Sequence, residues 1–507
     1  MVVKMDLYPA AGAFALAVIM PAPADAQVSM PGMTMPMAAK AHGKRKPAAR
    51  NQARKSAAKN ATESQYSPSE VSKPASKLAP PVGMPMNSGA MPTGPAPAPP
   101  MDHSRMGHMA MPEMKRSGHA NMEMNGALGP YPMQRESSGT AWQPDNSAHT
   151  GLMSMSDGWT LMAHGIVNLV YDRQSGPRGD DKIFANGMVM GMAAHRLGDG
   201  VLQFRASISP DPLMGPSGYP LLLASGETAN GRDRLIDRQH PHDFFMELSA
   251  SASQNVGPKS SIFIYGGLPG EPAFGPPAFM HREAILDSPE APISHHWLDS
   301  THVSFGVVTA GLVVDRFKLE VSRFNAREPD QHRWNIETGP LDSTAVRLSW
   351  NPTTELALQG SWGHFVDPEQ LDRGVDQKRW SASLLYSREV AKGWKIAGTL
   401  AWGRKTIGNH DDDAFVIEAS AKHAEWTIFG RGEMTENREL VPLNEDGPVY
   451  RVGKISLGAV RDFRIADHLS IGAGGLFAIN FVPTAIAPLY GGNNPTGAMA
   501  FVRLKLD

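Results

Sequence analysis

A stretch near the N-terminus carries interleaved methionines and histidines. Between Met101 and Met133 there are eight methionines and three histidines, with Asp, Gly, Pro and Ser between them, and the chain has no cysteine. Thioether and imidazole groups suit copper, particularly Cu(I), where thiolates are absent. We interpret the stretch as a Cu(I) sink; the alternative is a low-complexity spacer rich in methionine. The candidate ligands are Met101, His103, Met106, His108, Met109, Met111, Met114, His119, Met122 and Met124.

A second set of candidate metal ligands lies in two long loops further along the chain. It consists of His240, His242, His295, His296 and His302. If both loops fold into one pore, two or three imidazoles and a carboxylate such as Asp299 can surround a Zn, Cu(II) or Ni ion. The alternative is that these side chains only hydrogen-bond within a packed plug of loops. No tightly bound cofactor is expected; copper is expected as Cu(I) at the N-terminal stretch.

The elements that would carry these residues fall into two regions. Residues 1–26 resemble a signal peptide, with Lys4 before a short apolar run and Ala24-Asp-Ala at the cleavage site. Residues 27–155 are rich in Ala, Pro, Met and His and show no periodicity, which predicts a disordered leader. The basic run Lys40–Lys59 is either a solvated charge run or a contact for anionic lipid or cell-wall polymer; nucleic acid is not expected as a partner of an exported chain.

Residues 156–507 have the alternation of β-strands. In Trp394–Trp402, for example, apolar residues and glycine at even positions alternate with Lys395, Ala397, Thr399 and Ala401. About sixteen such segments follow one another, and the links between them alternate between short and long. Seven of the ten tryptophans fall near predicted strand ends. The pattern predicts an all-β fold, an antiparallel outer-membrane β-barrel whose short turns are periplasmic and whose long loops are extracellular.

Several loop motifs resemble those of a poorly characterised proteobacterial outer-membrane β-barrel family whose members occur with copper and heavy-metal resistance systems. The motifs include Ser209-Pro-Asp-Pro-Leu-Met-Gly, Asp237-Arg-Gln-His-Pro-His-Asp and Ser294-His-His-Trp-Leu-Asp-Ser-Thr-His. The resemblance covers residues 158–507 and implies a barrel without established catalytic residues. The Met/His leader before a barrel is also similar in layout to the copper-resistance B proteins.

The long loops are also dense in charge, at Arg232, Asp233, Arg234, Asp237, Arg238, Arg282, Glu283, Arg327, Glu328 and Asp330. Opposed charges across a lumen would tune solute passage, whereas ion pairs within the loops would only stabilise them. An enzyme is not expected, although His302 lies near Ser300 and Ser304, because no hydrolase signature accompanies these residues.

Together these features predict a protein of copper or metal homeostasis in the cell outer membrane. The leader would bind Cu(I) in the periplasm, and the barrel would be a channel or an anchor. The alternative is a general or solute-selective porin whose leader is a cell-wall tether. Expected partners are outer-membrane lipid, the barrel assembly machinery and periplasmic copper proteins.

Overall fold

The computed structural model describes residues 125–148, 151–391, 393–441 and 447–507. The signal peptide, the basic run and the ten leader ligands from Met101 to Met124 lie outside these residues. Within the described ranges, no helix is long and apolar enough to cross a membrane.

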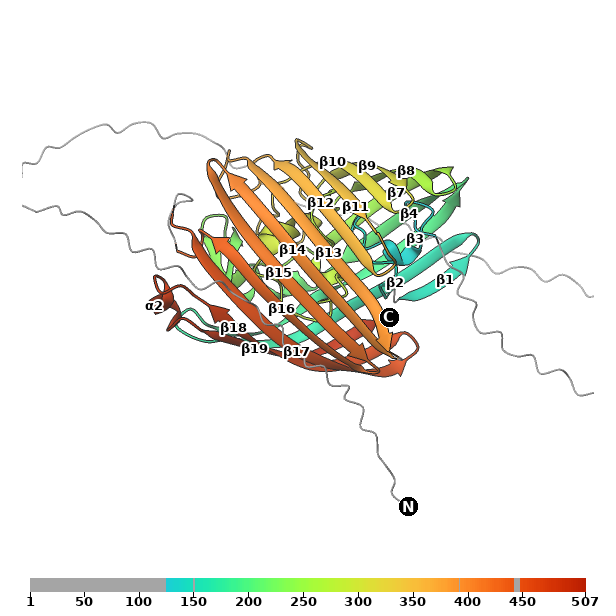
Figure 1. The fold of residues 1–507 in the computed structure, drawn as a ribbon. Helices are drawn as coiled ribbons and strands as arrows, with labels where there is room; N and C mark the ends of the chain where they lie inside the picture. Colours follow the sequence, from blue (N-terminus) through green and yellow to red (C-terminus); the bar gives the residue numbers. More distant parts are fainter. Residues whose placement is uncertain (1–124, 149–150, 392, 442–446) are drawn as a thin grey trace, which may run out of the picture. The chain divides into compact units, whose positions relative to one another are not determined.

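Sixteen antiparallel strands form a closed barrel (Figure 1). They are β2 (Trp159–Gln174), β3 (Asp181–Leu197), β4 (Gly200–Ile208), β7 (Phe245–Gly257), β8 (Ser260–Gly267), β9 (Val307–Val314), β10 (Phe317–Phe324), β11 (Ser343–Trp350), β12 (Leu356–Phe365), β13 (Gln377–Ala391), β14 (Trp394–Ile407), β15 (His410–His423), β16 (Trp426–Asn437), β17 (Tyr450–Ala466), β18 (Leu469–Phe481) and β19 (Thr496–Leu506). The predicted fold class and strand number are therefore confirmed.

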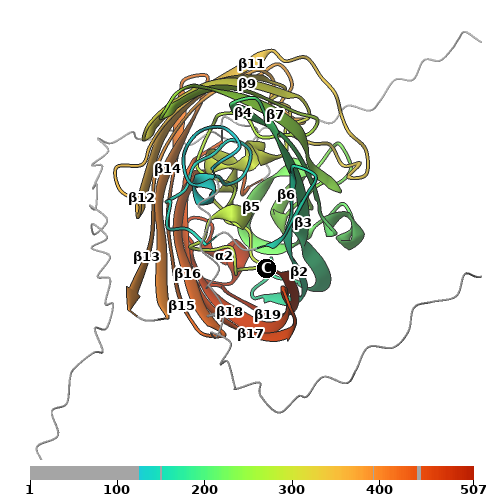
Figure 2. The same ribbon diagram turned by 90° about the vertical axis from the view of Figure 1, so that its right-hand side faces the viewer.

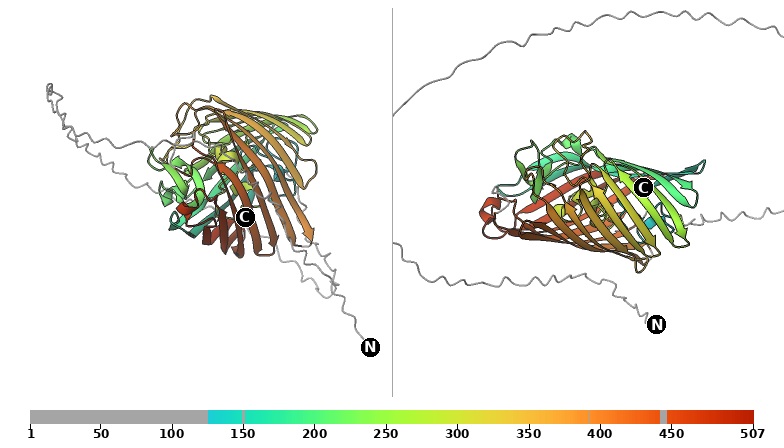
Figure 3. Two further views of the ribbon diagram at one scale, coloured as in Figure 1. Left: turned by 60° about the vertical axis from the view of Figure 1, so that its left-hand side comes forward. Right: turned by 90° about the horizontal axis from the view of Figure 1, so that it is seen from above.

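The first and last strands of the barrel close the wall. Gly497–Leu506 of β19 pairs with Gln174–Gly165 of β2. A short additional strand, β1 (Leu152–Ser156), pairs with Ala163–Trp159 of β2, on the part of β2 that β19 does not reach. The strands run obliquely across the wall (Figure 3), as closure of a sheet into a barrel requires.

Alternation along each strand places apolar side chains outside and polar side chains inside. On β10, Leu319 is 48% exposed, whereas Lys318 and Glu320 on the opposite face are buried. Exposed leucine, isoleucine, valine and phenylalanine recur on the outside of nearly every strand. An apolar outer surface with a polar lumen is the architecture of an outer-membrane β-barrel.

The connections segregate as predicted, with one exception. Short turns such as Gly198-Asp199 and Asp315-Arg316 lie at one end of the barrel, and the long loops lie at the other. The alternation of short and long links predicts a long loop over residues 405–412, and this prediction is wrong. Strands β14 and β15 continue through this segment and pair as far as Ile407 and His410, so that only Gly408 and Asn409 connect them. Polar residues on long strands that extend past the membrane cannot be told from loop residues by composition.

Inward-folded segments fill the lumen (Figure 2). The link from β4 to β7 contains η2 (Asp211–Met214) and a hairpin of β5 (Tyr219–Thr228) and β6 (Arg234–Gln239). The link from β8 to β9 contains η3 (Phe279–His281), α1 (His295–Leu298) and η4 (Ser300–His302). We refer to these two links, residues 209–244 and 268–306, as the plug. A further short helix, α2 (Ala487–Tyr490), lies in the link from β18 to β19.

Residues 125–148, which the sequence analysis assigned to the disordered leader, are instead packed inside the barrel. They contain η1 (Met133–Arg135) and hydrogen-bond both among themselves and to the wall. Arg205 donates to the carbonyl of Gly139, and the Ser261 hydroxyl donates to the carbonyl of Leu128. These partners come from distant strands, so the local sequence has no periodicity that would reveal the packing. Residues 125–148 therefore differ from the disordered leader predicted for residues 27–155, and residues 27–124 lie outside the described residues.

Among the charged loop residues, Arg282 forms buried ion pairs with the wall and within the plug, whereas Arg232 and Asp233 are exposed. The Arg282 guanidinium donates to Glu418 of β15 at 2.7 Å and to Asp299 at 2.5 Å, and Arg431 also pairs with Glu418. On the wall, Arg347 pairs with Glu320 at 3.0 Å. Such pairs fix the plug in one position because separating them would leave an uncompensated buried charge.

Candidate metal centre

Three of the predicted loop histidines converge inside the barrel. Ring nitrogens of His242, His295 and His302 all lie within 4.8 Å of one another, and all three residues are buried. His242 follows β6, His295 begins α1 and His302 ends η4. The cluster therefore draws one histidine from the first plug link and two from the second.

Contacts with the wall and with the link between β10 and β11 hold the segments that carry His295 and His242 in place. The backbone of Trp297 in α1 lies against Gly403 of β14, where a Cβ atom would come within 2.4 Å of the Trp297 carbonyl oxygen. The Trp297 indole donates to the carbonyl of Asp412 at 3.0 Å. On the other link, Arg333 pairs with Asp243, the residue after His242, at 3.2 Å. Glycine at 403 thus lets the element that carries His295 approach the wall.

The Nδ1 atom of each histidine has its own partner. His242 Nδ1 lies 2.8 Å from the Asp211 carboxylate, and His295 Nδ1 lies 2.9 Å from the Asp299 carboxylate. His302 Nδ1 donates to the backbone carbonyl of Asp299 at 2.7 Å. A proton on Nδ1 leaves the Nε2 lone pair available, which is the arrangement that carboxylates and carbonyls impose on metal-binding histidines.

The Nε2 atoms of His242 and His302 are buried without a hydrogen-bond partner. A buried nitrogen without a partner costs free energy, and a metal ion bound between the rings would supply the missing interaction. Three imidazole ligands suit Zn or Cu(II).

The electrostatics keep His295 and His302 neutral and Asp299 charged. Burial lowers the pKa of His302 to about 3 and lowers the pKa of His295. The pKa of Asp299 falls below its ordinary value despite its burial, chiefly because the Arg282 guanidinium lies beside it. Neutral imidazoles backed by a carboxylate are the protonation states that metal binding requires.

The other two predicted loop histidines lie beside the centre. The His240 ring is 5.9 Å from that of His295 and its Nε2 lies 3.1 Å from the Glu227 carboxylate. His296 packs against Gly226, where a Cβ atom would come within 2.7 Å of the ring. Gly226 has a φ of +118°, so the backbone conformation also favours glycine there. His240 and His296 therefore lie beside His242, His295 and His302.

Sequence reasoning missed Asp211 and assigned Asp299 a different role. Asp299 was considered as a direct ligand, whereas the structure makes it the partner of two histidines. Asp211 belongs to the motif Ser209–Gly215, and its contact with His242 spans 31 residues, so no local spacing indicated it. The serine–histidine pairing considered for His302 does not form: the Ser304 hydroxyl donates to the Thr301 carbonyl, and Ser300 accepts from Arg379.

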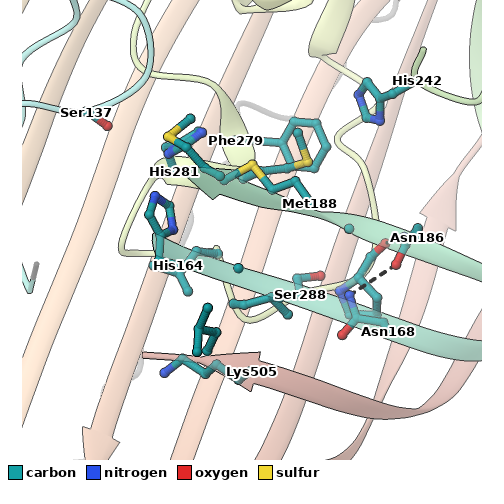
Figure 4. Close-up of a pocket in the computed structure, with 18 of the residues that line it drawn as sticks. Ser137, His164, Asn168, Asn186, Met188, His242, Phe279, His281, Ser288 and Lys505 are labelled. Carbon is teal, nitrogen blue, oxygen red and sulfur yellow. Dashed lines mark hydrogen bonds between the residues drawn. The ribbon is translucent and has the colours of Figure 1, made fainter. Parts of the chain in front are cut away.

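A second group of soft ligands lies nearby and was also missed. A cavity of about 140 Å³ between the plug and the strands β2 and β3 is lined by Met188, Met190, Met192 and Met280, and also by His164 and His281. His242 reaches the same cavity (Figure 4). The run Gly-Met-Val-Met-Gly-Met over residues 187–192 was the signal available in the sequence, because alternate methionines on a barrel strand share one face.

The sequence matches no model of a known protein family and no curated protein. Among solved structures, the chain is similar to OmpF from Salmonella typhi, solved as a complex with daunomycin, with a TM-score of 0.43 and 12% identity over 70% of this chain and 100% of that one. OmpT from Vibrio cholerae gives a TM-score of 0.41 and 10% identity, over 70% of this chain and 100% of that chain. The anion-selective porin from Comamonas acidovorans gives 0.38 and 12%, over 68% and 99%. The association with metal-resistance systems, which the loop motifs implied, stays a prediction.

Proposed function

We propose that this protein is an outer-membrane β-barrel of metal homeostasis that binds a transition-metal ion within its plug. The convergence of His242, His295 and His302 carries the proposal, because their nitrogens lie within 4.8 Å of one another. The apolar outer surface of the barrel supports a location in the outer membrane, with lipid as its partner.

Copper is the metal that the whole chain favours. Cu(II) suits three imidazoles, and the leader offers thioethers for Cu(I). In this proposal the leader, from Met101 to Met124, binds Cu(I) in the periplasm, where periplasmic copper proteins are its expected partners. The barrel then anchors the leader at the membrane and holds a second, divalent ion in the plug.

The main alternative is that the histidines only hold the plug together. The buried Nε2 atoms of His242 and His302 favour metal binding over this alternative, since a purely structural cluster would be expected to pair them.

The test is the number of Zn²⁺ ions that the purified full-length chain retains in detergent. Because the leader also contains histidines, the informative quantity is the difference between variants. We expect His242→Ala and His302→Ala each to lose one ion per chain relative to wild type. The matched control is His332→Ala, which removes an exposed loop histidine outside the centre. Equal zinc retention in all four proteins would reject the metal centre and leave the plug-packing interpretation.

A porin is the second candidate function, since sixteen strands enclose a polar lumen. Here the leader would be a cell-wall tether. The plug argues against an open pore, because charged wall residues such as Lys318 and Arg347 are buried rather than exposed to a channel. Conductance in planar bilayers separates the two: a porin gives steady open steps, whereas a plugged barrel gives none.

A further inference from the structure

The inner face of β2 and β3 departs from the polar lining found on much of the wall. Met188 and Met190 on β3 are buried on the lumen side, and Met192 continues the same row. The register places Met190 opposite His164 and Met192 opposite Met162 on β2. Further along the same pair of strands, Asn168 and Asn186 face the lumen and hydrogen-bond to each other at 3.1 Å (Figure 4). The methionines are thus confined to one part of an otherwise polar surface.

The plug presents the same chemistry to this part of the wall. Met280 and His281 of η3 line the cavity from the opposite side. The rings of His164 and His281 are 6.0 Å apart, edge to face. Figure 4 shows these two histidines close together, with Met188 beside them and His242 at the far end of the cavity. Wall and plug therefore contribute thioether and imidazole groups to one space.

Packing accounts for only some of these methionines. Met188 belongs to an apolar cluster with Met246, Val303 and Phe305, and Met280 packs against it. Among the described residues, no such cluster includes Met190 or Met192. Leucine would fill nearly the same volume at positions 190 and 192. We therefore attribute the methionines to the chemistry of their sulfur atoms rather than to packing.

We propose that this cavity binds a soft monovalent cation, Cu(I) or Ag(I), through the thioethers of Met188, Met190 and Met280. Neutral sulfur ligands select such ions over Mg²⁺, Ca²⁺ or Zn²⁺, which prefer oxygen or nitrogen. The thioether ligands differ from the three histidines of the other centre, although His242 lines the same cavity. The thioether site therefore extends the proposed function without resting on the plug histidines.

Silver is the probe for the test, because Ag⁺ favours thioethers and needs no reductant. The full-length chain in detergent is equilibrated with Ag⁺, and the ions retained per chain are counted by mass spectrometry. We expect the double variant Met188→Leu/Met190→Leu to lose one Ag⁺ per chain, since leucine preserves volume and removes sulfur. The matched control is Met499→Leu, a buried methionine of β19 that does not line the cavity.

Two further measurements make each outcome decisive. Met280→Leu tests the site from the plug side and is expected to lose the same Ag⁺ even if the wall variant fails to fold. Anomalous scattering from silver-soaked crystals of the full-length chain is expected to place the ion in the cavity. Equal silver retention in wild type and both cavity variants, or equal loss in Met499→Leu, would overturn the proposal. Unchanged Zn²⁺ retention in the cavity variants would show that the three-histidine centre is intact, so the two proposals can fail separately.

Discussion

At the scale of single residues, Asp299 organises the proposed metal centre. Its carboxylate contacts His295 Nδ1 and Arg282, and its backbone carbonyl accepts from His302 Nδ1. One residue thus orients two of the three rings and links them to the buried ion pairs of the wall. Asp211 performs the corresponding task for His242.

Replacing Asp299 with Asn should weaken zinc binding while leaving the three ligands in place. The amide keeps the size of the side chain but removes the charge that makes His295 a better ligand. We expect the affinity for Zn²⁺ at this centre to fall by about 10- to 100-fold. Competition titration with a chelator measures the change. Asp315→Asn, at an exposed short turn, is the matched control, and an equal loss there would contradict the role assigned to Asp299.

At the scale of elements, the sequence predicted the positions of the strands but few of the contacts within the plug. Alternation and turn residues predicted the sixteen strands because each strand satisfies its pattern locally. Residues 125–148 and the partners of His242 depend on contacts between distant segments, such as Arg205 with Gly139 and Asp211 with His242. The sequence predicted which histidines lie in the loops and that they could meet in the pore. It could not show which three converge, since this depends on how α1, η4 and the end of β6 pack.

The plug is held partly by Arg282, which pairs with Asp299 and with Glu418 of the wall. Arg282→Ala would leave two buried carboxylates without their common partner, a loss on the order of 3–5 kcal/mol. We expect the second plug link to detach and the barrel to conduct, whereas wild type stays closed. Planar-bilayer recordings measure the effect. Arg316→Ala, an exposed arginine at a short turn, should remain closed; a closed Arg282→Ala barrel would show that other contacts suffice.

The plug should also respond to pH through Glu271, which lies at the start of its second link. Burial raises the pKa of Glu271 to about 7, from an ordinary value of 4.5. Between pH 4.5 and 7 the packed plug holds a proton that the detached segment has released. The contribution of Glu271 to plug stability is therefore greatest below pH 4.5 and is lost as the pH rises through 7. Hydrogen exchange of residues 268–306 should accelerate from pH 5 to pH 8 beyond the intrinsic effect of pH.

Glu271→Gln provides the control for this pH dependence. Glutamine keeps the shape and never ionises, so the variant should lose the dependence. At pH 8 it should protect the link more strongly than wild type, by about 3 kcal/mol. An identical pH profile in wild type and variant would assign the dependence to another group.

At the scale of the whole molecule, the boundary between leader and barrel decides how the leader can be tested. Residues from Asn125 onward pack in the lumen, so a deletion of residues 101–133 would damage the barrel as well as remove ligands. Deleting residues 101–124 removes the candidate Cu(I) ligands and spares the packed segment.

We expect this shorter deletion to lower copper tolerance in a strain that lacks the native gene. Complementation with the intact gene should restore growth at high copper, because the leader then binds Cu(I). A control that replaces residues 101–124 with an equally long Gly/Ser segment keeps the spacing without the ligands and should behave like the deletion. Full tolerance with either variant would make the leader a tether and favour the porin alternative.

The pairing of β2 with β19 has a consequence for how the protein is made. The seam joins the first and last strands of the barrel, so the wall is complete only after the C-terminal strand has arrived. The segment 125–148 directly precedes this seam and carries charged groups such as Arg135 and Asp145, which cannot pass through an apolar wall. We therefore expect its capture inside the barrel to coincide with the last step of assembly. Residues 125–148 are synthesised before any strand of the barrel, whereas β19 is synthesised last. The segment can therefore enter the lumen before β19 closes the wall.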